Sequence, residues 1–221
     1  MNMINIPKFF YESTVHLLSN LKAYEERTNK YIDAFKNYIN NARMILDAGC
    51  SSGEFARKLA KKGNTIVALD IQKQLLTEIK EENIYKICAD ACYLPLRENS
   101  IDYVLSLSLI EHLKEPEKHI KEIRKALKRK GIFIIQIPNL QYIFEPHSKW
   151  PFLFIFPRKI QLIIFKSLNY PFVNMEVNLK KILLLLQEEK FRIREIKKIH
   201  HLNVMKLLPI APSYIIISEK C

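Results

Sequence analysis

The chain has 221 residues, of which 48% are hydrophobic and 26% are charged. This composition is that of an ordinary globular protein, and it excludes a disordered or fibrous chain. No stretch reaches the roughly 18 uninterrupted apolar residues that a membrane-spanning helix needs. The start MNMINIPKFF lacks the basic segment and apolar run of a secretory signal.

The charge balance is strongly basic, with 35 Lys and Arg residues against 23 Asp and Glu residues and a net charge of +12. Such an excess suggests an anionic partner, such as nucleic acid, an acidic lipid surface or a phosphorylated substrate. A solvated lysine-rich face explains the same charge, because net charge bears on association rather than on fold. The four cysteines suggest no disulfide framework, so we expect a cytoplasmic protein under reducing conditions.

Hydrophobic periodicity divides the chain into four parts that we expect to form a single domain. Residues 1–41 are predicted to form N-terminal helices, of which 8–41 has apolar positions at helical spacing. The part at 42–139 alternates short apolar runs with amphipathic segments. It predicts strands at 44–46, 65–69, 84–88, 101–107 and 132–137, and helices from Ser51 or Ser52 to Gly63, at 73–82 and at 117–130, the last stopped by Gly131.

The remaining two parts differ from this alternation. Residues 140–177 are aromatic and proline-bearing and include Trp150, which predicts a helical lid or insertion. Residues 178–221 predict a helix capped by Asn178, followed by strands at 191–199 and 213–218. Strands that alternate with helices predict an α/β fold, a Rossmann-like doubly wound sheet with helices on both faces.

Acidic residues follow the first three predicted strands, at Asp47, Asp70 and Asp90. In open α/β sheets, ligands bind beyond the carboxyl ends of the strands. Three carboxylates at one edge repel one another unless each has its own donor. S-adenosylmethionine supplies such donors, because it carries a sulfonium, an ammonium, two ribose hydroxyls and an adenine amino group.

Three stretches carry a resemblance to the class I S-adenosylmethionine-dependent methyltransferases, in particular to the small-molecule branch related to ubiquinone-biosynthesis methyltransferases. The glycine-rich loop and acidic strand end of that family resemble ILDAGCSSGEFARKLAKKGNTIVALD at 45–70. The adenine and substrate region resembles CADACYLPLRENSIDYVLSLSLIEHL at 88–113, and the match continues in PEKHIKEIRKALKRKGIFIIQIPN at 116–139. The resemblance implies an antiparallel last strand in the sheet.

The resemblance also implies a set of cofactor-binding residues. Gly49 and Gly53 allow the backbone to approach the cofactor, and Asp47 holds the loop or the ammonium group. Asp70 binds both ribose hydroxyls, and Asp90 accepts from the adenine amino group. The full set is Asp47, Gly49, Cys50, Ser51, Gly53, Asp70, Ile71, Asp90, Ala91, Leu107 and Ser108.

Side chains around the adenine and the sulfonium complete this picture. Ile71 and Leu94 are expected to sandwich the adenine, and the Ala91 amide faces the ring. Leu107 and Ser108 border the sulfonium. The chain departs from the family at Ser51, where glycine is common. A side chain at this position affects how closely the loop can approach the cofactor.

Two other kinds of site are disfavoured. A nicotinamide dehydrogenase needs G-x-G-x-x-G, but Gly49 is followed by Ser51 and Glu54 at the required offsets. A metal at Cys88 and Cys92 lacks a second pair of ligands, so we expect no metal.

The methyl acceptor is less well defined by the sequence. A hydroxyl acceptor needs a base, for which His112 and His147 are candidates, although either could be a structural or surface histidine. The proline-rich aromatic motif of amino-directed nucleic-acid methyltransferases is missing after the fourth strand, where the sequence is Ser106-Leu107-Ser108-Leu109. The sequence therefore favours a small-molecule or lipid-like substrate over nucleic acid.

The segment 142–172 mixes aromatic and basic residues, which suits a lid, a dimer contact or peripheral contact with an anionic membrane. We expect a methyltransferase that acts on an oxygen or carbon atom of a small, lipid-like or glycan-lipid acceptor. An RNA-associated methyltransferase and a catalytically idle cofactor-binding or scaffold protein are the alternatives.

Overall fold

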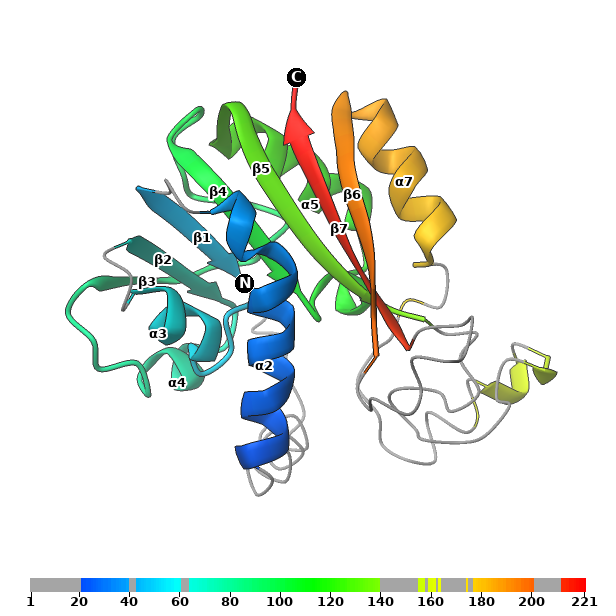
Figure 1. Cartoon of the computed structure of the whole chain (residues 1–221), viewed down its shortest axis with the longest axis horizontal. Helices are drawn as coiled ribbons and strands as arrows, with labels where there is room; N and C mark the ends of the chain where they lie inside the picture. The colour runs from blue at the N-terminus through cyan, green and yellow to red at the C-terminus, as the bar shows by residue number, and fades with distance from the viewer. Residues whose placement is uncertain are drawn as a thin grey trace, which may run out of the picture.

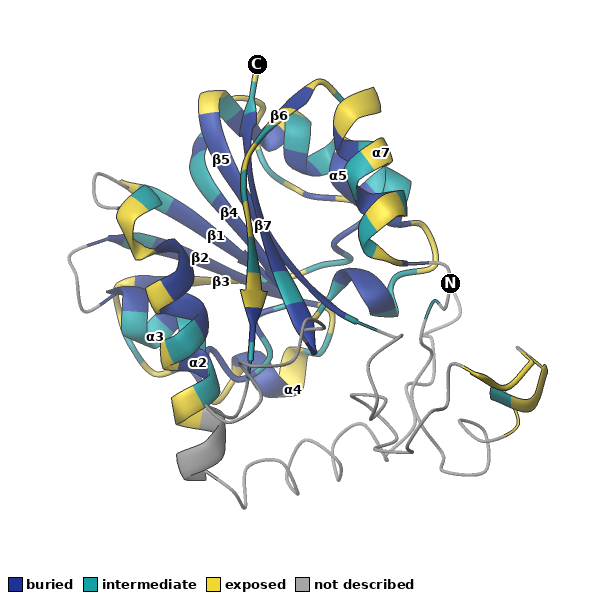
Figure 2. Ribbon diagram, turned by 45° about the vertical axis from the view of Figure 1, so that its right-hand side comes forward, coloured by how far each residue is buried: buried dark blue, intermediate teal, exposed yellow. Residues whose placement is uncertain are grey.

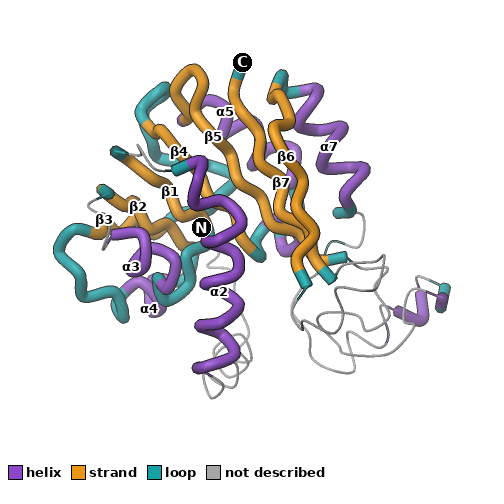
Figure 3. The backbone as a smooth tube through the Cα atoms, in the orientation of Figure 1, coloured by secondary structure: helices purple, strands orange, loops and turns teal. Residues whose placement is uncertain are grey.

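The structure is a computed structural model, and it describes residues 21–39, 43–60, 64–139, 155–157, 159–161, 163, 174, 177–200 and 212–221. Within these residues the fold is a single seven-stranded sheet between two layers of helices (Figures 1 and 3). The strands are β1 (Met44–Ala48), β2 (Thr65–Asp70), β3 (Ile84–Cys88), β4 (Ile101–Leu107), β5 (Leu127–Pro138), β6 (Phe191–Ile199) and β7 (Ser213–Lys220).

The strand order is β3-β2-β1-β4-β5-β7-β6. The pairs among β1 to β5 are parallel, whereas β7 is antiparallel to both of its neighbours, β5 and β6. This order confirms the predicted Rossmann-like doubly wound sheet and its antiparallel last strand. The carboxyl ends of β1, β2, β3 and β4 therefore meet at one edge of the sheet, where the predicted cofactor residues lie.

The helices cover both faces, as the alternating sequence pattern predicts. On one face lie α2 (Leu21–Phe35), α3 (Glu54–Ala60) and α4 (Lys73–Leu76), and on the other lie α5 (Pro116–Ala126) and α7 (Leu179–Glu188). Each face has its own buried core, because successive strand residues point to opposite sides. Ile45 and Leu46 of β1 illustrate this, since Ile45 packs with α2 and α3 and Leu46 packs with α5. Figure 2 shows the buried sheet between the more exposed helices.

The first two helices of the core begin or end differently from the prediction. No serine caps α3: the carbonyl of Gly53 accepts from the Arg57 amide, which places Gly53 at the start of the helix. The helix predicted at 73–82 extends only over Lys73–Leu76. Beyond it, i to i+3 bonds such as Ile79 N–H to Leu76 C=O tighten the chain into turns.

The helix predicted at 117–130 ends at Ala126, so the prediction that Gly131 stops it is wrong. Leu127 is buried, adopts an extended conformation and pairs with Ile101 of β4, which draws residues 127–130 into β5. At Gly131 an added Cβ would lie 2.8 Å from the Lys128 carbonyl oxygen, so the close backbone approach explains the glycine.

The terminal elements agree with the sequence pattern where they are described. Asn178 caps α7 by accepting from the Lys181 amide, as predicted. The N-terminal helix predicted at 8–41 is seen as α2 followed by a 3-10 turn at Lys36–Tyr38, and residues 1–20 lie outside the described residues. Most of the predicted lid at 140–177, with Trp150 and His147, also lies outside them.

Candidate functional site

The loop after β1 turns sharply beneath the carboxyl edge of the sheet. Gly49 has φ +72°, and its amide and that of Cys50 both donate to the Leu69 carbonyl of β2, at 2.8 and 3.0 Å. An added Cβ at Gly49 would lie 2.8 Å from a methyl group of Leu109, so a side chain is excluded by conformation and by space. These two bonds hold the loop backbone against β2.

Two further residues of the loop, Ser51 and Gly53, also have left-handed conformations. Ser51, at the place where the family often has glycine, has φ +52°. Gly53 has φ +85°, and an added Cβ there would lie 2.6 Å from Ile79. The departure at Ser51 therefore changes the side chain but preserves the glycine-like backbone, so the Ser51 amide still points to the end of β2.

Cys50 lies within this loop and is buried. Burial, followed by the neighbouring carboxylates of Asp47 and Asp70, raises the pKa of its thiol far above the usual value. The thiol is therefore neutral and unreactive at physiological pH.

Asp47 lies at the penultimate position of β1 and is only 2% exposed. One carboxylate oxygen, Oδ2, is buried without a hydrogen-bond partner among the described residues. Burial, with the nearby Asp70 carboxylate as the second cause, raises the pKa of Asp47 to about 7, and a backbone bond from Ala56 opposes this shift. A buried carboxylate oxygen without a donor is costly, so this position suits a ligand that brings a donor or a positive charge.

Asp70 ends β2 and is 8% exposed. Its Oδ2 accepts from the Ser51 amide at 2.9 Å and its Oδ1 from the Gln72 amide at 2.8 Å. Burial raises its pKa, although these backbone bonds oppose the shift. Each oxygen retains a second lone pair, so the fixed carboxylate can accept from two further donors such as the hydroxyls of a ribose.

The loop after β3 contributes the predicted adenine contacts. Asp90 lies two residues beyond β3 and accepts from the Cys92 amide at 2.8 Å through Oδ1. Ala91 and Leu94 are buried, whereas Ile71 is 46% exposed at the same edge of the sheet. An exposed apolar side chain beside a partly buried carboxylate suits a flat heterocycle with an amino group.

The end of β4 is held by β5. Ser108 has φ +53°, and both its amide and its hydroxyl donate to Oε1 of the buried Gln136, at 2.8 and 2.7 Å. Leu107 is buried and Ser108 is exposed, which leaves Ser108 at the surface of the edge. Gln136 was not identified in the sequence, because a glutamine within an apolar strand carries no motif signal.

His119 is a second residue that sequence reasoning missed. It is fully buried on α5, with Nδ1 2.9 Å from the Ala91 carbonyl oxygen and Nε2 3.1 Å from Ser106 Oγ. Because a carbonyl only accepts, Nδ1 carries the proton and Nε2 accepts from the serine hydroxyl. Burial lowers the pKa of His119 to about 4. The spacing of His119 and Ile123 on the apolar face of the helix is the signal that would have placed it in the core.

The two predicted bases have different outcomes. His112 is half-buried in a 3-10 turn (Ile110–His112) that follows β4, so it lies at the carboxyl edge as predicted. His147 lies outside the described residues. Beside His112, Glu111 is 2% exposed and its Oε2 has no hydrogen-bond partner in the described part of the chain.

This arrangement, a doubly wound sheet with a glycine turn after β1 and an acid at the end of β2, is the class I methyltransferase fold. A crystal structure of an S-adenosylmethionine-dependent methyltransferase from Archaeoglobus fulgidus superimposes with a TM-score of 0.65 at 20% identity, covering 88% of this chain and 94% of that one. Residues 46–135 match the methyltransferase domain family. The fold and this match confirm the resemblance of the core to the class I S-adenosylmethionine-dependent methyltransferases.

Curated relatives match the same region. The ubiquinone/menaquinone biosynthesis C-methyltransferase of Rickettsia prowazekii is 36% identical over 104 residues, covering 41% of this chain and 42% of the relative. The malonyl-[acyl-carrier protein] O-methyltransferase of Buchnera aphidicola is 35% identical over 92 residues, covering 41% and 37%. The chain thus spans about two fifths of the length of the curated relatives it matches.

The family and the fold imply S-adenosylmethionine as the cofactor, and the residues present fit it. The partnerless Oδ2 of Asp47 suits a cationic group, and the fixed Asp70 carboxylate can accept from further donors. In the described residues, no group of His, Cys, Asp and Glu side chains could hold a metal ion. None of the helices described is long and apolar enough to cross a membrane.

Proposed function

We propose that the protein transfers the methyl group of S-adenosylmethionine to an oxygen or carbon atom of a small or lipid-like acceptor. One observation carries the proposal: two buried acids, Asp47 and Asp70, share the edge of the sheet, and Asp47 retains an oxygen without a donor. The Asp70 carboxylate adds to the rise in the pKa of Asp47, so the pair favours a ligand with several donors and a positive charge.

The proposed contacts follow from the positions of the side chains. Asp70 accepts from the ribose hydroxyls, and Asp90 accepts from the adenine amino group beside Ile71. Asp47 faces the ammonium group, and Ser108 lies next to the sulfonium. When bound, the cofactor supplies an electrophilic methyl group, so the main tasks of the protein are alignment and exclusion of water.

The chemistry of the relatives supports two kinds of acceptor atom. One relative is named as a C-methyltransferase and the other as an O-methyltransferase. A hydroxyl or carbon acceptor loses a proton as the methyl group arrives, and His112 is the base that we propose for it. Its position just after β4 places it on the same edge as Ser108.

The experiment that tests this function incubates the purified chain with methyl-labelled S-adenosylmethionine and separate metabolite, lipid and RNA fractions. We expect the label in the metabolite or lipid fraction. Calorimetry with S-adenosylhomocysteine measures cofactor binding independently of turnover. No affinity for this product would refute the proposal, and label in RNA alone would refute the acceptor class. Binding without label in any fraction would favour an idle cofactor-binding protein.

A further inference from the structure

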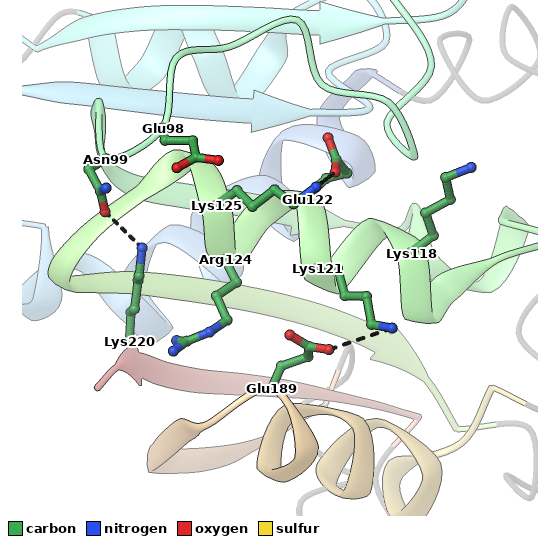
Figure 4. A pocket seen from close by; sticks show the side chains of 9 residues that line it. All are labelled: Glu98, Asn99, Lys118, Lys121, Glu122, Arg124, Lys125, Glu189 and Lys220. Carbon is green, nitrogen blue, oxygen red and sulfur yellow. Dashed lines mark hydrogen bonds and ion pairs between the residues drawn. The ribbon is translucent and has the colours of Figure 1, made fainter.

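A hollow of about 530 Å³ lies away from the cofactor edge, on the flank of the molecule formed by α5, the end of α7 and the end of β7 (Figure 4). It reaches the loop that precedes β4 and the last residues of the antiparallel β7, which places it toward the opposite edge of the sheet. None of its lining residues belongs to the proposed methyltransferase site. They are Glu98, Asn99, Lys118, Lys121, Glu122, Arg124, Lys125, Glu189 and Lys220.

The lining is basic, and part of its charge is already neutralised. Lys125 pairs with Glu122 at 2.7 Å, and Lys121 lies 4.0 Å from Glu189. Exposed pairs of this kind contribute little to stability, but they satisfy both partners. Among the described residues, no carboxylate contact of this kind is seen for two of the cations that line the hollow, Arg124 and Lys220.

Arg124 is the side chain that points to a ligand. Its Nη1 is buried and has no hydrogen-bond partner within the described residues. Figure 4 shows its guanidinium group extending into the space between Lys220 and Glu189. A buried charged donor without an acceptor is costly, and an oxyanion in the hollow would remove that cost.

Lys220 places a second positive charge beside it. Its ammonium group donates to Asn99 Oδ1 at 2.9 Å and to the Leu127 carbonyl oxygen at 2.6 Å, which fixes its position. Burial and then the Arg124 charge lower the pKa of Lys220, whereas the Glu98 carboxylate raises it. Two like charges held together in one hollow repel each other, and an anion between them would stabilise both.

We propose that this hollow binds the phosphate group of a small phosphorylated molecule, with Arg124 donating through its fork of N–H groups and Lys220 as the second cation. A guanidinium group matches the geometry of a phosphate with two parallel bonds. The volume lies within the range of small-molecule sites. Because Arg124 and Lys220 line a hollow rather than a flat face, the site suits an anion that enters it rather than a membrane surface.

The test titrates the full chain with inorganic phosphate, against sodium chloride at equal ionic strength, and follows backbone amide shifts. We expect saturable shifts at residues 98–99 and 121–125. Arg124→Gln should weaken phosphate binding about tenfold or more, as expected for a lost charge-assisted bond. Lys80→Gln removes the same charge from an exposed position on the other face of the sheet, so its effect should stay within about twofold.

A variant expected to gain affinity guards against loss of folding. Glu98→Gln removes the carboxylate that opposes an anion in the hollow, so phosphate binding should tighten about two- to fivefold. Equal weakening by Arg124→Gln and Lys80→Gln, or no saturable shift, would overturn the proposal. Binding to phosphatidic acid vesicles without binding of free phosphate would also overturn it, in favour of a lipid surface.

Discussion

The backbone amide of Ser51 donates to Oδ2 of Asp70 at 2.9 Å, so the turn after β1 holds the acid at the end of β2 in place. Ser51 makes this bond with φ +52°, a left-handed conformation that costs an L-residue about 1–2 kcal/mol. The bond uses only the backbone, so the serine side chain is not what holds the carboxylate. The position can therefore accept glycine, which adopts this conformation without strain.

Ser51→Gly should raise the free energy of unfolding by up to about 1 kcal/mol, since relief of the strained φ exceeds the extra flexibility of glycine in the unfolded chain. Urea denaturation measures the change. Ser51→Ala is the matched control, because it removes the hydroxyl and preserves the strain, and it should give no gain. A glycine variant less stable than the alanine variant would show that the left-handed turn is not strained.

Asp70→Asn should weaken binding of S-adenosylhomocysteine about ten- to a hundredfold, because it removes the charge from the bonds proposed to the ribose hydroxyls. Calorimetry gives the dissociation constants. Asp33→Asn, which changes an exposed acid of α2 that pairs with Lys36, is the control and should leave affinity unchanged. Equal affinities for the wild type and Asp70→Asn would contradict the assignment of Asp70 as the ribose ligand.

The sequence predicted the positions of the strands better than the ends of the helices. Residues 101–107 and 84–88 are strands with the predicted bounds, because buried apolar runs between turn residues leave little choice. The end of α5 was predicted wrongly at Gly131, because burial of Leu127 against Ile101 overrides local helix propensity. Such tertiary pairing is invisible to a local pattern.

The candidate site shows the same division. Asp47, Asp70 and Asp90 could be placed at one edge from the sequence, because the carboxyl ends of parallel strands lie at the same edge of the sheet. The residues that hold the site in place could not be predicted in this way. His119, for example, contacts the Ala91 carbonyl and Ser106, which are 28 and 13 residues away in the sequence. Long-range hydrogen bonds to backbone atoms leave no motif, and only the fold brings these partners together.

His112→Asn should lower kcat about a hundredfold if His112 takes the acceptor proton, with little change in affinity for S-adenosylhomocysteine. Turnover with the acceptor found by labelling, together with calorimetry, separates the two effects. His200→Asn, at the end of β6, is the control and should preserve kcat. An unchanged kcat in His112→Asn would exclude His112 as the base.

Asp47→Asn should stabilise the cofactor-free protein at pH 8 and weaken cofactor binding at the same pH. The pKa of Asp47 is raised from 3.8 to about 7 in the fold, so the folded state holds its proton where the unfolded chain has lost it. Stability therefore falls as the pH rises from about 4 to 7, and each pKa unit corresponds to about 1.4 kcal/mol.

The measurement for Asp47→Asn is urea denaturation of both proteins at pH 5 and pH 8. The gain in the variant should be larger at pH 8, because asparagine does not titrate. A gain equal at both values of pH, or a loss at pH 8, would show that the buried carboxylate is not destabilising. A gain in stability together with weaker cofactor binding would show that Asp47 favours binding of the ligand and lowers the stability of the fold.

His119→Gln should remove one cause of the loss of folding stability at acid pH. The pKa of His119 is lowered by burial from 6.5 to about 4, so the unfolded chain takes up a proton before the folded state does. The stability present above pH 6.5 is therefore lost progressively as the pH falls toward 4, by about 3 kcal/mol in total. Glutamine retains an amide donor for the Ala91 carbonyl and does not titrate.

Urea denaturation between pH 4 and 7 tests this, with the difference between the wild type and the variant as the observable, so that the titration of other carboxylates cancels. The wild type should be the more stable at pH 7, because its imidazole satisfies both the Ala91 carbonyl and Ser106, and this advantage should shrink as the pH falls. A constant difference across this range would mean that His119 accepts its proton in the folded state as readily as in the unfolded chain. The loop that carries Asp90 would then not depend on a neutral imidazole.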